Sequence, residues 1–298
     1  MNSNAKAWLA YAGVALFWGT TFLAMRIGVK SMPPFLMAGV RHSIGGVIIC
    51  SFFLIKGHSL PNLAQFKIFV VNGILMLVIG NGLITLAEIH ITSGLTALIC
   101  ALTPLIIIGM NAIFGEIKEP LKPTAWVGIG ACLIAQVIIF RDNIADFANP
   151  DYVMGIGFIL LAITGWALGS VYNKNKTTGV NLLYGAGLQM ISGGVILLII
   201  GSILGEWQRF TPTTEGINAV VYLIIFGSFI GYGSYMYVLK ALPATIVSTY
   251  AYINTIVAVF LGWLWLNEKL NLAVFIAVSL TIFGVWLVNK SFYKKAQG

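Results

Sequence analysis

Ten apolar stretches of about 18 residues or more constrain the fold of this 298-residue chain more than any other feature. They cover approximately residues 8–28, 35–55, 68–88, 93–114, 124–140, 153–173, 182–204, 217–238, 245–266 and 272–289. Charged residues make up 9% of the chain, against roughly 25% in a soluble domain. Because so little polar surface remains, the sequence predicts an integral membrane protein.

The apolar stretches predict helices rather than strands. Strands of a membrane barrel would alternate polar and apolar residues over about 10 positions, and the sequence has no such alternation. A helix satisfies all of its own backbone hydrogen bonds inside lipid. We therefore expect an all-α integral membrane fold with ten transmembrane helices.

The basic residues indicate how these helices are oriented. The net charge of +8 would suggest nucleic acid in a soluble protein, but here it is a topology signal and no nucleic-acid partner is expected. Loops on the cytoplasmic side of a membrane are enriched in Lys and Arg. With the N-terminus inside, the inner side receives Lys6, Lys56, Lys67, Lys118, Lys122, Lys174, Lys176, Lys240, Lys290, Lys294 and Lys295. Both termini are therefore predicted to be cytoplasmic.

The two halves of the chain resemble each other about 150 residues apart. Trp18 corresponds to Trp166, and Ile79-Gly80-Asn81-Gly82 corresponds to Ile230-Gly231-Tyr232-Gly233. The polar segment between Arg141 and Tyr152 separates the halves, so we expect one repeat over residues 1–146 and a second over residues 147–298. Each repeat holds five helices, an odd number, and the second repeat must therefore cross the membrane in the opposite sense. Inverted repeats of this kind are typical of secondary transporters.

Several motifs resemble the EamA domain. In the first half these are Phe17-Trp18-Gly19-Thr20-Thr21-Phe22, Pro33-Pro34-Phe35, Gly39-Val40-Arg41, Ala87-Glu88, Ser93-Gly94-Leu95-Thr96-Ala97-Leu98 and Leu102-Thr103-Pro104-Leu105. Leu266-Asn267-Glu268, followed by Gly284-Val285, is similar to the end of a second EamA repeat. The resemblance implies the drug/metabolite transporter superfamily, with two inverted five-helix EamA repeats. It is nearest to the exporter branch of the bacterial cytoplasmic (inner) membrane, which exports small metabolites, amino acids or drugs.

Two tryptophans are the first candidates for a binding site. Trp18 and Trp166 lie near the middle of their helices, whereas Trp usually lies at the membrane interface. One from each repeat would flank a central cavity and could stack on an aromatic or cationic substrate. Alternatively, each fills a gap between helices.

A polar stripe on the third helix supplies candidates for substrate binding and for gating or coupling. Asn81, Thr85 and Glu88 stand at i, i+4 and i+7, and therefore on one face. We expect Asn81 and Thr85 to contact the substrate. Glu88 could pair with Arg41 to close the outer side, contact the substrate, or carry a coupling proton. Arg41 could instead reach the outer headgroups, and Arg26 is the third intramembrane charge.

Uncharged polar residues complete the predicted pocket. They are Thr103, Tyr232, Tyr250 and Asn254, which could also hold helices together by hydrogen bonds. With the two tryptophans they would suit a neutral or zwitterionic solute of amino-acid size. The sequence has no phosphate-binding Gly-x-x-x-x-Gly-Lys-Ser/Thr loop, and neither a metal site, a cofactor nor an enzymatic activity is expected.

These features predict a secondary transporter that exports a small metabolite or drug across the cytoplasmic membrane by alternating access. An energy-independent facilitator is one alternative, and an intramembrane lipid-modifying transferase is an alternative from another class. The expected partners are a small-molecule substrate and membrane lipids, with protons as the candidate coupling ion. The assembly would be a monomer or a homodimer.

Overall fold

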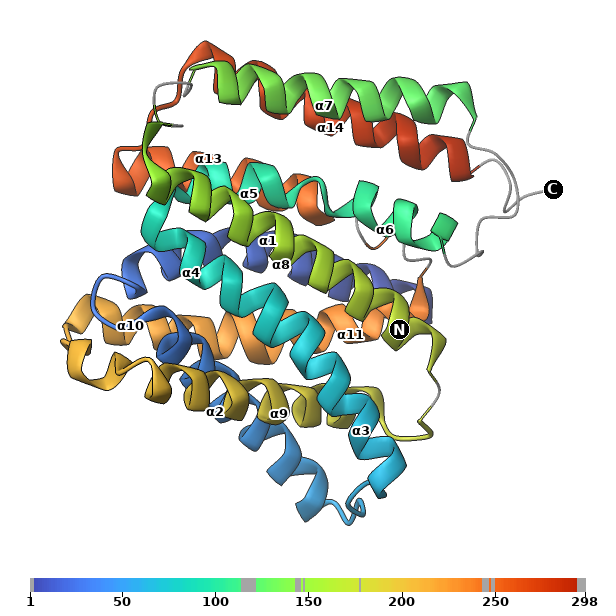
Figure 1. Cartoon of the computed structure of the whole chain (residues 1–298). Coiled ribbons are helices and arrows are strands. Elements are labelled where there is room, and N and C mark those ends of the chain that lie inside the picture. Colours follow the sequence, from blue (N-terminus) through green and yellow to red (C-terminus); the bar gives the residue numbers. More distant parts are fainter. Residues whose placement is uncertain are drawn as a thin grey trace.

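The computed structural model of the chain is a bundle of helices (Figure 1), and it describes residues 3–113, 122–142, 146, 148–176, 178–242, 247 and 250–293. The elements are α1 (Ser3–Gly28), α2 (Pro34–Ile55), α3 (Leu63–Asn72), η1 (Gly73–Gly82), α4 (Leu83–His90), α5 (Ser93–Cys100), α6 (Thr103–Ile113), α7 (Pro123–Asp142), α8 (Pro150–Asn175), α9 (Leu182–Ile203), η3 (Glu206–Arg209), α10 (Thr214–Tyr222), η4 (Leu223–Tyr232), α11 (Gly233–Ala241), α13 (Tyr250–Leu266) and α14 (Leu272–Tyr293). No strand occurs among these residues, so the all-α prediction is confirmed for them.

Seven helical segments of the described chain are long and apolar enough to cross a membrane. They cover residues 5–28, 34–55, 63–90, 93–110, 150–174, 182–203 and 214–241. Shorter apolar helices at Pro123–Ala135, Tyr250–Leu266 and Leu272–Val288 occupy the places of the other predicted spans. The count of ten spans therefore stays a prediction.

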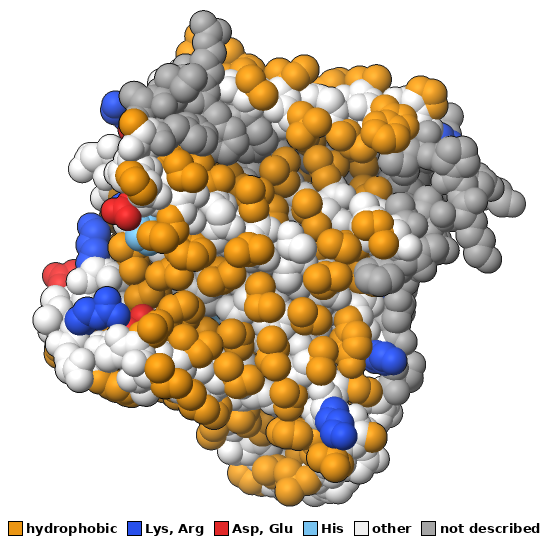
Figure 2. Space-filling model, in the orientation of Figure 1, with side chains coloured by type: hydrophobic (Ala, Val, Ile, Leu, Met, Phe, Trp, Pro, Cys, Tyr) orange, Lys and Arg blue, Asp and Glu red, His pale blue; other side chains and the backbone are white. Residues whose placement is uncertain are grey.

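The surface of the bundle fits a lipid environment. Figure 2 shows a face whose middle is covered by hydrophobic side chains, with Lys, Arg, Asp and Glu toward its edges. Many large apolar side chains are exposed, among them Ile55 at 86% and Trp126 at 63%. A water-soluble monomer rarely exposes so much contiguous apolar surface. In Figure 1, α1 begins and α14 ends at the same edge of the bundle.

The helix contacts recur when the two halves are exchanged. The helix α1 packs against η4 and α13, and its counterpart α8 packs against η1 and α5. Two further contacts, α2 with α9 and α7 with α14, join equivalent helices of the two halves. The helices α1 and α8 therefore occupy equivalent positions, each in contact with the other half.

Three of the predicted spans are not uniform α-helices. The third and the eighth contain π-helical middles, η1 and η4, which are ten residues long and lie at equivalent places in the two halves. Both are rich in glycine, which weakens the preference for regular α-helix. The fourth is interrupted between α5 and α6 at residues 101–102, just before Pro104, which cannot donate a backbone hydrogen bond.

Two carboxylates from the second half cap helices of the first half. Glu206 accepts a hydrogen bond from the backbone N–H of Leu36 (2.8 Å) at the start of α2. Glu268 accepts one from the backbone N–H of Ser93 (2.9 Å) at the start of α5. Asn267 has a φ of 54°, a left-handed conformation that Asn tolerates, and it turns the chain so that Glu268 can reach α5. The Leu266-Asn267-Glu268 motif thus has a structural role in joining the two halves.

Candidate functional site

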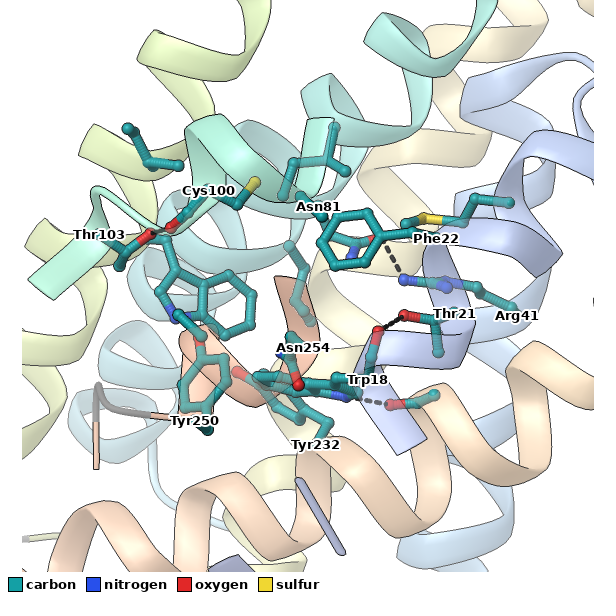
Figure 3. A pocket seen from close by; sticks show the side chains of 18 of the residues that line it. Trp18, Thr21, Phe22, Arg41, Asn81, Cys100, Thr103, Tyr232, Tyr250 and Asn254 are labelled. Atoms are coloured by element: carbon teal, nitrogen blue, oxygen red, sulfur yellow. Dashed lines mark hydrogen bonds between the residues drawn. The ribbon is translucent and has the colours of Figure 1, made fainter. Parts of the chain in front are cut away.

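A cavity lies between the two halves. Its walls come from α1, α2, η1, α4, α5, α6, α8, η4 and α13. Seven of the residues that we predicted to bind substrate line it: Trp166, and the residues Trp18, Asn81, Thr103, Tyr232, Tyr250 and Asn254 that Figure 3 labels. Seven of the predicted residues therefore lie around one cavity, while their role in binding stays a prediction.

An aromatic cluster forms one wall of the cavity. The rings of Trp18 and Trp166 meet edge to face with their centroids 5.3 Å apart, and Tyr250 lies 5.2 Å from Trp18 in the same manner. Trp18 Nε1 donates to the carbonyl of Gly227 (2.9 Å), and Trp166 Nε1 donates to the hydroxyl of Tyr235 (3.2 Å). Both indole N–H groups are thus satisfied within the protein, so a ligand would meet the rings through stacking rather than through the N–H groups.

Each tryptophan of this cluster packs against a glycine of the opposite half. A Cβ at Gly231 in η4 would collide with the indole of Trp18, and one at Gly80 in η1 would lie 2.9 Å from an indole carbon of Trp166. These glycines are the second residues of the two Ile-Gly-x-Gly motifs. The repeated Trp and Gly therefore form two reciprocal contacts between the halves.

Arg41 supplies the positive charge of the cavity. Its side chain is 3% exposed, and its Nη2 donates to Asn81 Oδ1. His42 Nε2 lies 3.2 Å from the same oxygen, and His42 Nδ1 lies 3.4 Å from the Ser228 hydroxyl. The predicted pair of Arg41 with Glu88 is therefore wrong, because Arg41 lies at the depth of Asn81, about 10 Å along the helix from Glu88. The alternative that Arg41 reaches the headgroups is also wrong, since its buried side chain lines the cavity.

Glu88 is completely buried outside the cavity lining. Neither oxygen of its carboxyl group has a hydrogen-bond partner in the described part of the chain. The guanidinium of Arg26 donates to the backbone carbonyl of Glu88, and Arg26 also lines a second hollow, together with Lys30 and Glu268. Arg26 therefore joins the backbone of Glu88 to the wall of this second hollow.

One predicted substrate residue does not reach the cavity. Thr85 is buried, and its hydroxyl donates to the backbone carbonyl of Asn81 (2.9 Å). The predicted set left out eleven of the lining residues, and helical spacing from Trp18 would have found Thr21, Phe22 and Met25, since i+3, i+4 and i+7 lie on one face. The other eight are His42, Leu77, Ile84, Ala97, Cys100, Ile163, Gly227 and Ala251. In the described residues, no three His, Cys, Asp or Glu side chains come together as metal ligands.

The contact between Arg41 and Asn81 has a neutral counterpart in the second half. Gln189 and Tyr232 occupy the equivalent positions, and the Tyr232 hydroxyl donates to Gln189 Oε1 (2.6 Å). Gln189 Nε2 donates in turn to Asn173 Oδ1 (3.3 Å). Equivalent helices are therefore joined in both halves. The contact between α2 and η1 uses a cation, and the contact between α9 and η4 uses neutral side chains.

Comparisons with known proteins place these features in a family. The profile of the EamA-like transporter family matches twice, over residues 5–141 and residues 153–290. An inner membrane transporter of Escherichia coli strain K12, named YedA and described as uncharacterized, is 36% identical over 93% of this chain and 89% of its own length. The uncharacterized transporter YoaV of Bacillus subtilis is 22% identical over 97% of this chain and 99% of its own length.

The fold also matches a solved structure. A protein known from its crystal structure superposes with a TM-score of 0.70 at 22% identity, covering 95% of this chain and 96% of the other. The similarity shows a shared fold. Together, the family profile and the names of the relatives point to a transporter rather than an enzyme.

Proposed function

The chain belongs to the EamA-like transporter family, and from this we propose that it exports a small organic solute across the cytoplasmic membrane of a bacterium by alternating access. Residues 1–146 and 147–298 would form the two inverted five-helix repeats, with both termini in the cytoplasm. The observation that carries the proposal is the central cavity, to which each half contributes one tryptophan, Trp18 and Trp166.

The reciprocal contacts suggest how access could alternate. Trp18 on Gly231 and Trp166 on Gly80 are related by exchange of the halves. Rocking one half against the other would loosen one contact while the other stays closed, so that the cavity opens to one side at a time. The π-helical segments that carry both glycines would take up this motion, as such segments often mark functional sites.

Glu88 is the candidate group for coupling transport to protons. A buried carboxylate without a hydrogen-bond partner is costly in its charged form, so a change of its environment can bind or release a proton. Arg26 and Glu268 are the charged groups that interact electrostatically with the Glu88 carboxyl group, which also interacts with the Cys100 thiol. If Glu88 carries no proton, the same cavity would serve an energy-independent facilitator.

Counterflow in proteoliposomes tests the proposal. The purified protein should exchange at least one solute from a panel of amino acids, amines and nucleosides between the vesicle interior and the medium. Equal movement in protein-free vesicles for every solute would contradict the transport proposal.

The same vesicles test coupling through Glu88. We expect an imposed pH gradient to drive uphill flux in the wild type, and Glu88→Gln to abolish this drive while exchange continues. Glu215→Gln, a change in an exposed carboxylate, is the matched control and should behave like the wild type. Flux that ignores the gradient in both wild type and Glu88→Gln would remove the coupled version and leave the facilitator.

A further inference from the structure

The central cavity holds a buried cation that has no counter-ion among the described residues. Within that part of the chain Arg41 Nη1 has no hydrogen-bond partner, although the side chain is 3% exposed. Among the described residues that line the cavity, none is Asp or Glu. A guanidinium keeps its charge in proteins, and a buried charge is costly unless an opposite charge and hydrogen bonds compensate it. Arg41 is therefore incompletely compensated by this chain's described residues.

The oxygen atoms around Arg41 do not complete its hydrogen bonding. Asn81 Oδ1 accepts from Nη2 and also lies within hydrogen-bond distance of His42. The weaker contact of Nε with His42 Nε2 is 3.4 Å long. These contacts occupy one side of the guanidinium and leave Nη1 free for a further acceptor.

The repeat indicates that the charge is not needed for packing. At the position equivalent to Arg41, the second half has Gln189, which is 2% exposed and bonds to Tyr232 and Asn173. A neutral amide is thus sufficient to join these two helices. The guanidinium of Arg41 consequently has a role that the helix contact itself does not explain.

A second unsatisfied group faces the same cavity. Asn254 in α13 is 4% exposed, and none of the residues that the structure describes gives its Oδ1 a hydrogen bond. Figure 3 shows Arg41 and Asn254 directed into the same space, with Trp18 and Phe22 beside it. The cavity therefore offers a cationic donor, a neutral acceptor and aromatic surface to one occupant.

Building on the proposed transport function, we infer that the substrate is a small monocarboxylate with an apolar or aromatic body and one hydrogen-bond donor. Its carboxylate would bind the guanidinium of Arg41, because the planar fork of donors matches two carboxylate oxygens. Its donor, an ammonium or a hydroxyl, would reach Asn254 Oδ1. Arg41 is the single Lys or Arg in the described lining, so a polyanion would be poorly compensated, and an amine without a carboxylate would be repelled.

Four matched probes test this inference with the full-length protein in detergent. They are phenylalanine, 3-phenylpropionate, 3-phenylpropionamide and phenethylamine, each added at millimolar concentration while the melting temperature is measured. The two carboxylates should raise the melting temperature, and the amide and the amine should raise it less. Equal shifts for all four, including no shift for any, would overturn the inference.

Substitutions at Arg41 test whether this side chain causes the preference for carboxylates. Arg41→Gln places the residue of the second half at the same position, and it should weaken carboxylate binding roughly tenfold while leaving amide binding unchanged. Arg41→Lys keeps the charge and should retain part of the preference, which covers the case in which the glutamine variant fails to fold. Arg209→Gln, in an exposed position of η3, is the control and should keep the full preference. A preference that survives in both folded Arg41 variants at full strength would contradict the assignment.

Counterflow with the same probes separates this inference from the proposed function. Exchange of the amide or amine as fast as the carboxylates would leave transport standing and refute the carboxylate preference. Arg41-dependent binding without any exchange would leave the binding inference standing and refute the transport function.

Discussion

The position of each tryptophan shows how single residues divide between lipid and cavity. Six of the eight Trp side chains are at least 44% exposed on the outside of the bundle: Trp8, Trp126, Trp207, Trp263, Trp265 and Trp286. Trp166 is 7% exposed and Trp18 is partly buried, and both donate their indole N–H inside the protein. These two rings therefore contribute surface to an internal site rather than to the membrane interface.

Truncation of either ring should weaken solute binding. We expect Trp18→Ala and Trp166→Ala each to reduce the affinity for a stabilising probe roughly tenfold, since the lost ring removes both buried area and edge-to-face contact. Titration by thermal shift measures the effect. Trp126→Ala, at a 63% exposed position on α7, should bind as the wild type does. Unchanged affinity in both cavity variants would place the site elsewhere.

The sequence predicted the polar residues of the site better than their partners. Helical spacing placed Asn81, Thr85 and Glu88 on one face, but it could not show how deep Arg41 lies beside that face. The depth is set by the packing of α2 against η1 and α9, which is a contact between segments far apart in the chain. For this reason Arg41 meets Asn81 rather than Glu88, and Thr85 turns to the backbone of its own helix.

At the level of helices, the paired π-helical segments carry the two glycines against which the tryptophans of the opposite half pack. Both Trp–Gly contacts depend on the missing side chain at Gly80 and Gly231. Hydropathy predicted the helical spans that contain Gly80 and Gly231, because the length of an apolar stretch is the same whether its backbone hydrogen bonds follow the α-helical or the π-helical pattern. The same property explains why neither the π-helical register nor the break before Pro104 was predicted.

Adding a methyl group at either glycine should destabilise the bundle. We expect Gly80→Ala and Gly231→Ala to cost about 1–3 kcal/mol each, because the new Cβ collides with an indole ring of the other half. Thermal unfolding in detergent measures the loss. Gly157→Ala on α8 has open space around its Cβ and should be neutral or slightly stabilising. Equal stability of all three variants would show that the contacts are not tight.

At the level of the whole molecule, the apolar stretches predict the fold, whereas the loop charges predict its orientation in the membrane. The stretches predicted the all-helical membrane fold because each helix must satisfy its backbone inside lipid. The loop charges predict the absolute orientation, with both termini in the cytoplasm. Reporter fusions at the two ends should therefore be active only with a reporter that works in the cytoplasm. Activity of a periplasmic reporter at either end would contradict this orientation.

Alternating access is the central claim, and the natural cysteines allow a direct measurement of it. Cys100 lines the cavity, whereas Cys50 and Cys132 are buried elsewhere and can be replaced by alanine. A membrane-impermeant thiol reagent is applied to right-side-out and inside-out vesicles, with a Cys100→Ser chain as the blank. We predict that Cys100 is labelled from both sides and that a bound carboxylate probe slows labelling from each. Labelling from one side alone, or from neither, would contradict alternating access through this cavity.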